Sequence, residues 1–275
     1  SLEAFRYFRG INPRVWLSMN TNGGARDEEY WAELAKVFGR MGAVIFSIDG
    51  LEDTNHLYRQ KVNWNNVMQN AKAFINAGGR ARWDFIVFKH NEHQVEEAQQ
   101  LSNDLGFETF QFKKTGRFFS TASHTGKESH QAVNKKGELT QKLEKPKDKY
   151  VNKALHKEQE LVTKHGSMDN YYKQVKIDCK VKKEKSIFIT AEGMLMPCCW
   201  VGGQMYKWYW PPKHSDVWPF IDKQDLNVKN NSIKEVMDGP FLKAIENSWQ
   251  DESRPKVCAN KCGVEFDAFG EQFTQ

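Results

Sequence analysis

Four of the five cysteines in this 275-residue chain are spaced so that they could hold a metal centre. Cys179, Gly193 and Cys198 form the pattern C-x13-G-x4-C, and Cys258 and Cys262 follow as C-x3-C. No basic-then-apolar signal sequence is recognisable, so we expect a cytoplasmic protein. Because thiols in a reducing compartment bind metals more often than they form disulfides, the pattern indicates a metal site.

The spacing leaves the identity of the metal open. Structural zinc sites typically use tight C-x2-C pairs, whereas 18 residues separate the first two cysteines here. An iron–sulfur cluster is larger and accepts wider separations, so we favour a cluster held by Cys179, Cys198, Cys258 and Cys262. We expect Cys199 to be a small buried apolar residue that faces away from this site, because neighbours along a strand point in opposite directions.

The elements around these cysteines are predicted from local patterns. Two strands at 187–190 and 194–196 form a β-hairpin, with Gly193 at the turn position that needs a positive φ. This hairpin would bring the first two cysteines to the same end. A helix is predicted over 232–247, and the last two cysteines are placed in a turn flanked by proline and glycine.

The first 113 residues alternate between apolar runs typical of strands and amphipathic runs typical of helices. Strands are predicted at 15–19, 43–46, 83–88 and 107–112, and helices from residue 28, over 64–77 and over 95–104. This order is typical of βαβ units around a parallel sheet, whose strands end at one common edge. Ligands bind at that edge in such folds, and the polar residues there are Asn20, Thr21, Asn22, Ser47, Asp49, His90 and Asn91. Turn formation alone explains roughly half of them.

The middle of the chain is basic. From Lys113 to Lys185 it has 19 Lys and Arg residues against 9 Asp and Glu. This stretch has few large apolar residues, so we expect a solvated, flexible insertion or linker. Lysine outnumbers arginine and aromatic residues are sparse, which argues against a nucleic-acid partner. No apolar run approaches the roughly 18 residues of a membrane span, so no membrane partner is expected.

Several motifs together resemble the radical S-adenosylmethionine enzymes that carry a SPASM or twitch C-terminal extension. They are Thr21-Asn22-Gly23, the run from Phe46 to Leu51, Tyr58-Arg59 and the cysteine–glycine pattern. The resemblance covers about residues 15–112 and 178–264. The cysteine spacing is its specific part, and the first 113 residues would belong to the barrel of such an enzyme.

This resemblance implies a fold, cofactors and a reaction. The fold is α/β: a partial (βα)6 TIM-like barrel, with about four βα units present, followed by a small hairpin-and-helix domain for an auxiliary [4Fe–4S] cluster. S-adenosylmethionine and a second [4Fe–4S] cluster would bind in the full-length parent and yield a 5′-deoxyadenosyl radical. That radical abstracts hydrogen from a peptide or small-molecule substrate, with electrons from a reductant such as flavodoxin or ferredoxin.

The resemblance also assigns cofactor contacts. Ser47 matches the residue that touches the ribose of S-adenosylmethionine, and Asn22 and Asp49 lie on the same rim. Arg59 could pair with the methionyl carboxylate, because a guanidinium can bind both oxygens. A surface ion pair is an equally good explanation for this arginine.

This chain departs from the family pattern at two places. The C-x3-C-x2-C motif for the radical-generating cluster and the Gly-Gly-Glu motif are absent, and no cysteine precedes Cys179. We therefore expect the C-terminal two-thirds of an enzyme, inactive by itself, with domains at 1–113, 114–175 and 176–275. Four usable cysteines suffice for one auxiliary cluster, so the twitch type with an electron-transfer role fits better than a full SPASM domain.

Two alternatives from other functional classes remain open. One is a zinc-binding, non-enzymatic module whose basic arm binds nucleic acid. The other is a cluster-free homologue of the radical enzymes that acts as a peptide-binding or scaffold protein.

Overall fold

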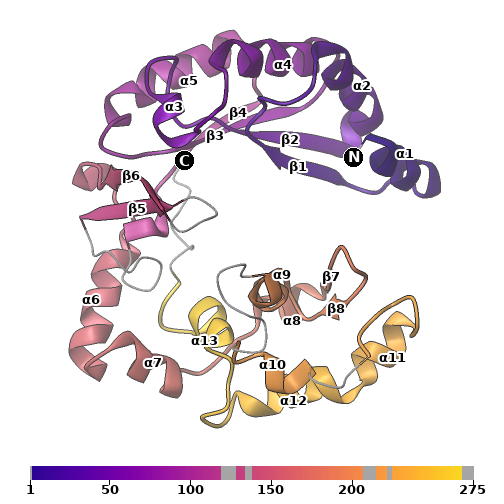
Figure 1. Cartoon of the computed structure of the whole chain (residues 1–275), viewed down its shortest axis with the longest axis vertical. Coiled ribbons are helices and arrows are strands. Elements are labelled where there is room, and N and C mark those ends of the chain that lie inside the picture. Colours follow the sequence, from indigo (N-terminus) through magenta and orange to yellow (C-terminus); the bar gives the residue numbers. More distant parts are fainter. Residues whose placement is uncertain (1, 119–127, 134–137, 207–214, 222–224, 268–275) are drawn as a thin grey trace. The chain divides into compact units, whose positions relative to one another are not determined.

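The computed structural model describes residues 2–118, 128–133, 138–206, 215–221 and 225–267, and the chain divides into two compact units (Figure 1). Unit 1 comprises the chain up to Asn152, and unit 2 begins at Lys153. This division falls inside the segment 114–175 that we predicted to be an insertion. The three predicted domain boundaries stay a prediction.

Unit 1 is built on a four-stranded parallel sheet, which confirms the α/β class. Its strands lie in the order β1 (Leu17–Thr21), β2 (Gly42–Ser47), β3 (Ala81–Ile86) and β4 (Thr109–Lys113). The helices between them are α2 (Glu28–Phe38), α4 (Trp64–Asn76) and α5 (Val95–Asp104), and they lie on one face of the sheet (Figure 1). Each predicted strand and helix of this region therefore exists, with ends shifted by a few residues.

The helix-covered face holds the core of unit 1. In β3, Trp83 and Phe85 are fully buried in this core, while Arg82 and Asp84 alternate onto the opposite face. The helices begin where the sequence offers caps. Asp27 accepts a hydrogen bond from the backbone of α2, and Asn63 does the same for α4.

A helix that the sequence did not predict precedes β1. Helix α1 (Leu2–Ile11) has no fully buried residue, although its apolar residues recur at helical spacing, as at Leu2, Phe5 and Phe8. Arg9 anchors it, because its guanidinium donates to the carbonyl oxygens of Val37 at 3.1 Å and Phe38 at 2.9 Å. These carbonyls end α2, where a positive charge is favourable.

Short helical turns complete unit 1. They are η1 (Gly39–Met41), α3 (Asn55–Tyr58), η2 (Glu92–Gln94), η3 (Gly116–Phe118) and η4 (Asp148–Tyr150). The described residues of the basic segment also include an antiparallel hairpin, β5 (Ser129–Val133) with β6 (Leu139–Glu144). Leu143 of this hairpin is buried, and the amide of Lys89 donates to the carbonyl of Glu144 at 3.1 Å. The lysine-rich composition did not indicate this folded hairpin, because its few buried residues are scattered among many lysines.

Unit 2 contains short strands and many helices. Its elements are α6 (Ala154–His165), α7 (Met168–Gln174), α8 (Lys180–Glu184), β7 (Phe188–Ile189), β8 (Leu195–Met196), α9 (Cys199–Gly203), η5 (Gln204–Tyr206), α10 (Trp218–Ile221), α11 (Ile233–Asp238), α12 (Pro240–Ser248) and α13 (Lys256–Cys262). The predicted β7–β8 hairpin is confirmed, and Gly193 in its turn has φ +91°. Among the described residues, no helix combines the length and apolar character needed to cross a bilayer.

Two local predictions in unit 2 were wrong. The single helix expected over 232–247 is two helices that meet at Gly239, because Pro240 has no amide hydrogen to continue the first one. The turn expected around Cys258 and Cys262 is helix α13. A Pro N-cap starts this helix, and its few apolar positions gave only a weak helical pattern.

Candidate functional site

All four predicted metal ligands line one cavity in unit 2. Cys179, Cys198, Cys258 and Cys262 share its wall with mostly apolar neighbours, among which are Ile177, Val201, Ile245, Trp249 and Val257. Cys262 is buried, and the other three are partly buried. The four thiols singled out from the sequence thus lie at one site, although they span 84 residues of chain, and their role as metal ligands stays a prediction.

Main-chain pairing brings Cys179 next to Cys262. Ile177 forms an isolated antiparallel bridge with Gly263, and the amide of Asp178 donates to the carbonyl of Cys262 at 2.8 Å. This pairing joins the residues just before Cys179 to Cys262 and Gly263, so it brings the two cysteines together at the cavity wall. The thiol of Cys262 donates a hydrogen bond to the sulfur of Cys179.

The other two thiols are positioned by helices. Cys198 is the N-cap of α9, and its sulfur accepts the amide of Val201 at 3.4 Å. Cys258 and Cys262 lie four residues apart in α13, which places both sulfurs on the same face of that helix. Helix α13 therefore brings Cys258 and Cys262 together, which is the role that the predicted turn was expected to have.

The pKa values of these thiols reflect their shared environment. The hydrogen bond from Cys262 lowers the pKa of Cys179 to about 6, and the same bond raises the pKa of Cys262. Burial raises the pKa of Cys258 to about 12 and also raises that of Cys198, with neighbouring sulfur charges adding to the effect. Lys261 also lines the cavity and could offset one thiolate. Four thiolates would need further positive charge, because like charges in a mostly apolar cavity repel.

The four thiols supply the sulfur atoms that several kinds of metal site require. Four thiols in one apolar-walled cavity are the ligands that an iron–sulfur cluster uses. In the described part of the chain, no three side chains of His, Cys, Asp or Glu are arranged to hold a single metal ion. In ligand type the residues fit a cluster, which is held by cysteine thiolates.

The fifth cysteine does not behave as expected. Cys199 is exposed, so the expectation that it is a small buried apolar residue is wrong. The reason is local: Cys198 ends the extended segment, and Cys199 is the first residue of α9, so strand alternation does not apply. It is nevertheless not among the residues that line the cavity.

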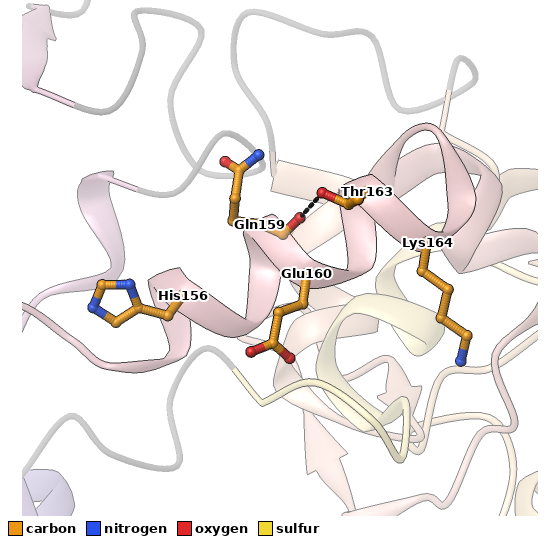
Figure 2. A pocket seen from close by; sticks show the side chains of 5 residues that line it. All are labelled: His156, Gln159, Glu160, Thr163 and Lys164. Carbon is orange, nitrogen blue, oxygen red and sulfur yellow. Dashed lines mark hydrogen bonds between the residues drawn. The ribbon is translucent and has the colours of Figure 1, made fainter.

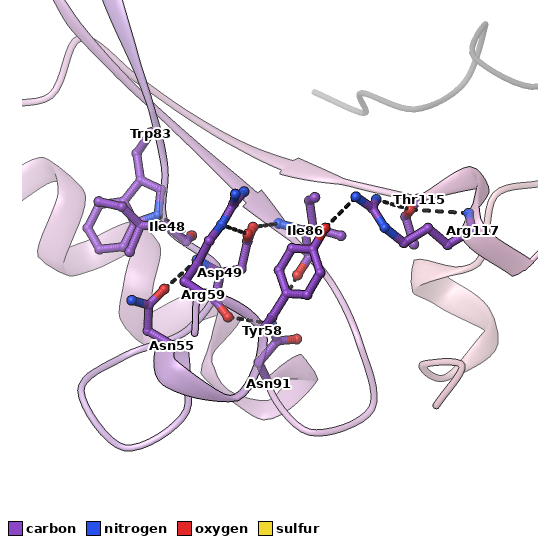
Figure 3. A network of polar contacts seen from close by, with 10 residues as sticks. All are labelled: Ile48, Asp49, Asn55, Tyr58, Arg59, Trp83, Ile86, Asn91, Thr115 and Arg117. Atoms are coloured by element: carbon purple, nitrogen blue, oxygen red, sulfur yellow. Dashed lines mark hydrogen bonds and ion pairs between the residues drawn. The ribbon is translucent and has the colours of Figure 1, made fainter. Parts of the chain in front are cut away.

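A second candidate site lies at the carboxyl edge of the sheet in unit 1 (Figure 3). Asp49 is fully buried there and pairs with Arg59, with 2.6 Å between Oδ2 and Nε. Its other oxygen accepts the amide of Ile86 at 2.5 Å. Burial raises the pKa of Asp49, against the opposing effect of the Arg59 charge.

Two amide side chains complete the surroundings of Asp49. The side-chain oxygen of Asn55 accepts the amide of Asp49 at 3.0 Å, and the Asn91 amide donates to its carbonyl at 2.9 Å. Arg59 also lies over the ring of Tyr58, 5.0 Å from its centroid. Every polar atom of Asp49 thus has a partner within the protein, which is an arrangement typical of a structural anchor.

The remaining predicted contacts lie nearby. Ser47 is the last residue of β2 and is partly buried. Asn22 is exposed, and its side chain accepts the amide of Gly24 at 3.1 Å, which is turn chemistry. The structure therefore places Asn22, Ser47 and Asp49 at the ends of β1 and β2, and Arg59, the C-cap of α3, is held there by its ion pair with Asp49. The cofactor contacts of all four stay a prediction.

Sequence reasoning missed charged residues on the same edge. Arg82 and Asp84 pair on the uncovered face of β3, with 2.7 Å between Nε and Oδ1. Arg117 donates to the hydroxyls of Tyr58 and Thr115 (Figure 3). The alternation of charged and apolar residues in β3 was the available signal, whereas Arg117 carried none, because it lies beyond the last predicted strand.

A broad hollow of about 540 Å³ lies along α6 (Figure 2). All of its lining residues come from this one helix: His156, Gln159, Glu160, Thr163 and Lys164. Thr163 donates to the carbonyl of Gln159 at 2.9 Å, and the charges along the face have both signs. A single helix face of mixed charge is typical of a solvated surface and not of a phosphate-binding one.

Comparisons with known proteins give only distant similarities. No protein-family model matches the sequence, and no curated protein matches it. Solved structures that resemble the chain include Streptococcus suis SuiB bound to S-adenosylmethionine, with 13% identity, a TM-score of 0.47, and coverage of 95% of this chain and 57% of that one. SuiB bound to its precursor peptide SuiA gives 12% identity, a TM-score of 0.47, and coverage of 95% and 56%.

A further similar structure is native anSMEcpe with bound AdoMet and the Kp18Cys peptide. It has 14% identity and a TM-score of 0.47, and the match covers 98% of this chain and 76% of that one. The chain spans a little over half of the length of the SuiB chains. Similarity at these values assigns this chain neither a fold family nor a ligand, and its own residues must supply the grounds for a function.

Proposed function

We propose that this chain is a portion of a radical S-adenosylmethionine enzyme of the SPASM or twitch type, and that unit 2 holds one auxiliary [4Fe–4S] cluster. The carrying observation is the convergence of Cys179, Cys198, Cys258 and Cys262 on one apolar cavity. When bound, such a cluster supplies one-electron transfer. With four protein ligands it would have no iron position left for a substrate, which favours an electron-transfer role.

The arrangement of the thiols favours a cluster over the zinc alternative. One zinc ion needs four ligands at roughly 2.3 Å from a common point. The described residues contain no group of three or more suitable side chains in such an arrangement. The reason for preferring a cluster is the spacing in the sequence, where 18 residues separate the first two cysteines.

The sheet in unit 1 supports the second part of the proposal. We infer that a partial TIM-like barrel presents S-adenosylmethionine to a peptide or small-molecule substrate at the carboxyl edge of these strands. Ser47 and Asn22 would contact the cofactor there. Arg59 is already paired with Asp49 through Nε, so it would act on a carboxylate through its other nitrogen atoms.

Radical generation needs more than these 275 residues contain. No cysteine precedes Cys179, so the chain alone cannot hold the radical-generating cluster, and we expect no S-adenosylmethionine cleavage from it. A reductant such as flavodoxin or ferredoxin, in the cytoplasm, would be the electron donor of the whole enzyme.

Anaerobic reconstitution with iron and sulfide tests the cluster. We expect about four iron and four sulfide per chain, visible charge-transfer absorption, and loss of both in Cys258→Ser. Cys199→Ser is the matched control, because this cysteine is adjacent in sequence to a ligand but exposed outside the cavity. Equal iron loss in both variants, or a wild-type protein that takes up only zinc, would refute the proposal.

A further inference from the structure

Two guanidinium groups lie against the same tyrosine ring at the carboxyl edge of the sheet in unit 1. The guanidinium carbon of Arg59 is 5.0 Å from the ring centroid of Tyr58, and that of Arg117 is 5.1 Å from it (Figure 3). The ring of Tyr58 packs on buried Phe88, with 4.9 Å between the two centroids. Two positive charges are therefore held close together on a ring that a buried side chain keeps in place.

The two charges are balanced differently. Arg59 has the carboxylate of Asp49 as its partner, at 2.6 Å. Arg117 donates instead to two neutral hydroxyl groups, that of Thr115 at 2.9 Å and that of Tyr58. The ion pairs of the described residues include none with Arg117, so its positive charge has no protein counter-charge in direct contact among them.

Neighbouring charges add to this surplus. Lys113 ends β4, in register with Ile86 of β3. Burial lowers the pKa of Lys113, the charges of Asp84 and Asp49 oppose this effect, and those of Arg117 and Arg82 add to it. The charges gathered at this edge are thus two carboxylates, Asp49 and Asp84, and four cations, Arg59, Arg82, Lys113 and Arg117. Such an excess of positive charge favours an anionic ligand.

The position of Arg117 is fixed before any ligand binds. Its backbone amide and its side chain both donate to the buried hydroxyl of Thr115, at 3.2 Å and 2.9 Å. The next residue, Phe118, is buried in a cluster with Ile86, Phe88 and Leu143. A guanidinium has more N–H donors than the two side-chain bonds of Arg117 use. An anion could therefore bind it with little further loss of side-chain entropy.

Two other arginines near β3 have carboxylate partners. Arg80 pairs with Glu108 at 2.8 Å, and Arg82 pairs with Asp84 at 2.7 Å. These ion pairs explain both residues without a ligand. Arg117 is partly buried, and a charge in that environment is unfavourable without a counter-charge or water.

We propose that Arg117 is a specificity-determining residue that binds a carboxylate group of the substrate, so that the substrate class is acidic. The anion site stands on the contacts of Arg117, whereas the assignment of its occupant to the substrate rests on the proposed function. A planar carboxylate matches the guanidinium fork through two parallel hydrogen bonds. Arg59 would remain the contact for the methionyl carboxylate, so the two arginines would receive different molecules.

A peptide titration of the metal-free chain tests this site. The probe is N-acetyl-Gly-Glu-Gly-amide, whose single charge is the glutamate carboxylate, and the matched probe has glutamine in its place. Binding is followed by 15N NMR of the arginine side chains, and the Arg117 signal is identified by its absence in Arg117→Gln. We expect only the glutamate peptide to shift this signal. Arg117→Gln should weaken binding of that peptide about tenfold, which is about 1.4 kcal/mol.

Two further variants serve as controls. Arg80→Gln removes the same charge from unit 1, but this residue precedes β3 at the opposite end of the strand, so its dissociation constant should stay within about twofold of wild type. Arg117→Lys keeps the charge and loses the planar fork, so it should restore only part of the affinity. This variant also replaces Arg117→Gln in the comparison if circular dichroism shows that the glutamine variant is unfolded.

The outcomes separate the two proposals. Equal binding of both peptides by the wild-type chain, or equal losses in Arg80→Gln and in the Arg117 variants, would overturn the role of Arg117. A chain in which inorganic phosphate shifts the Arg117 signal and the glutamate peptide does not would overturn the carboxylate assignment. The titration needs no iron, so a failure of iron uptake would refute the proposed function and leave the anion site standing.

Discussion

Asp49 at the sheet edge and Cys258 in the cavity are both buried ionisable groups, but their surroundings differ in kind. Asp49 has an arginine, a backbone amide and two side-chain amides as partners. The cavity of Cys258 offers other thiols, mostly apolar walls and the side chain of Lys261. The first site is complete without a ligand, whereas four ionised thiols in the second would need more positive charge than the one ammonium of Lys261 supplies. A polar cluster therefore suggests a ligand when its members do not satisfy one another.

The largest expected loss of stability is that of Asp49→Ala. The substitution leaves the part-buried Arg59 without its partner, so we expect the free energy of unfolding to fall by about 3–5 kcal/mol. Urea unfolding followed by circular dichroism measures it, with the exposed Glu52→Ala as control. A loss below about 1 kcal/mol would show that Asp49 is no structural anchor.

Gly193→Ala should have an intermediate effect on the hairpin that leads to Cys198. Its φ of +91° is strained for alanine, and the new Cβ would lie 2.9 Å from Oδ1 of Asn227. We expect a loss of about 1–3 kcal/mol and reduced iron uptake. Gly203→Ala is the control, because a Cβ there meets nothing within 4 Å. Equal effects of the two substitutions would contradict this role of the turn.

Cys198→Ser should barely change the stability of the metal-free protein. Serine is a good N-cap, so it can still accept the amide of Val201 at the start of α9. We expect a change within about 1 kcal/mol in urea unfolding, together with loss of iron after reconstitution. A destabilisation as large as that of Asp49→Ala would remove the contrast between the two sites.

The smallest expected effect is a pH dependence from His90. Burial lowers its pKa, and the charges of His93 and His56 add to the effect. Below about pH 6.5 the unfolded chain binds a proton that the folded protein does not, so stability falls as the pH drops through this range. His90→Gln should reduce this slope by less than about 1.4 kcal/mol per pH unit, and His93→Gln should reduce it by a smaller amount, because it removes only one of the effects that lower the pKa of His90. Unfolding free energies at several pH values check the sign, and a steeper slope in His90→Gln would disprove it.

Prediction from the sequence succeeded where local pattern was sufficient. Helix α5 has the predicted bounds, and the four strands of the sheet follow from short apolar runs separated by helices. It failed for α13, whose apolar residues are too few to establish a helical period, and it overlooked α1, whose apolar residues do recur at helical spacing. The break at Gly239 was visible as a Gly-Pro pair, but the apolar positions on both sides outweighed it in the prediction.

The identity of the four candidate ligands was determined by sequence alone, because cysteine is rare and its chemistry is specific. Only the tertiary structure decided that Arg59 pairs with Asp49, that Cys199 is exposed and that the four thiols share one cavity. Residue type limits what a side chain can bind. Its partner is set by contacts between segments far apart in the chain, which local patterns do not encode.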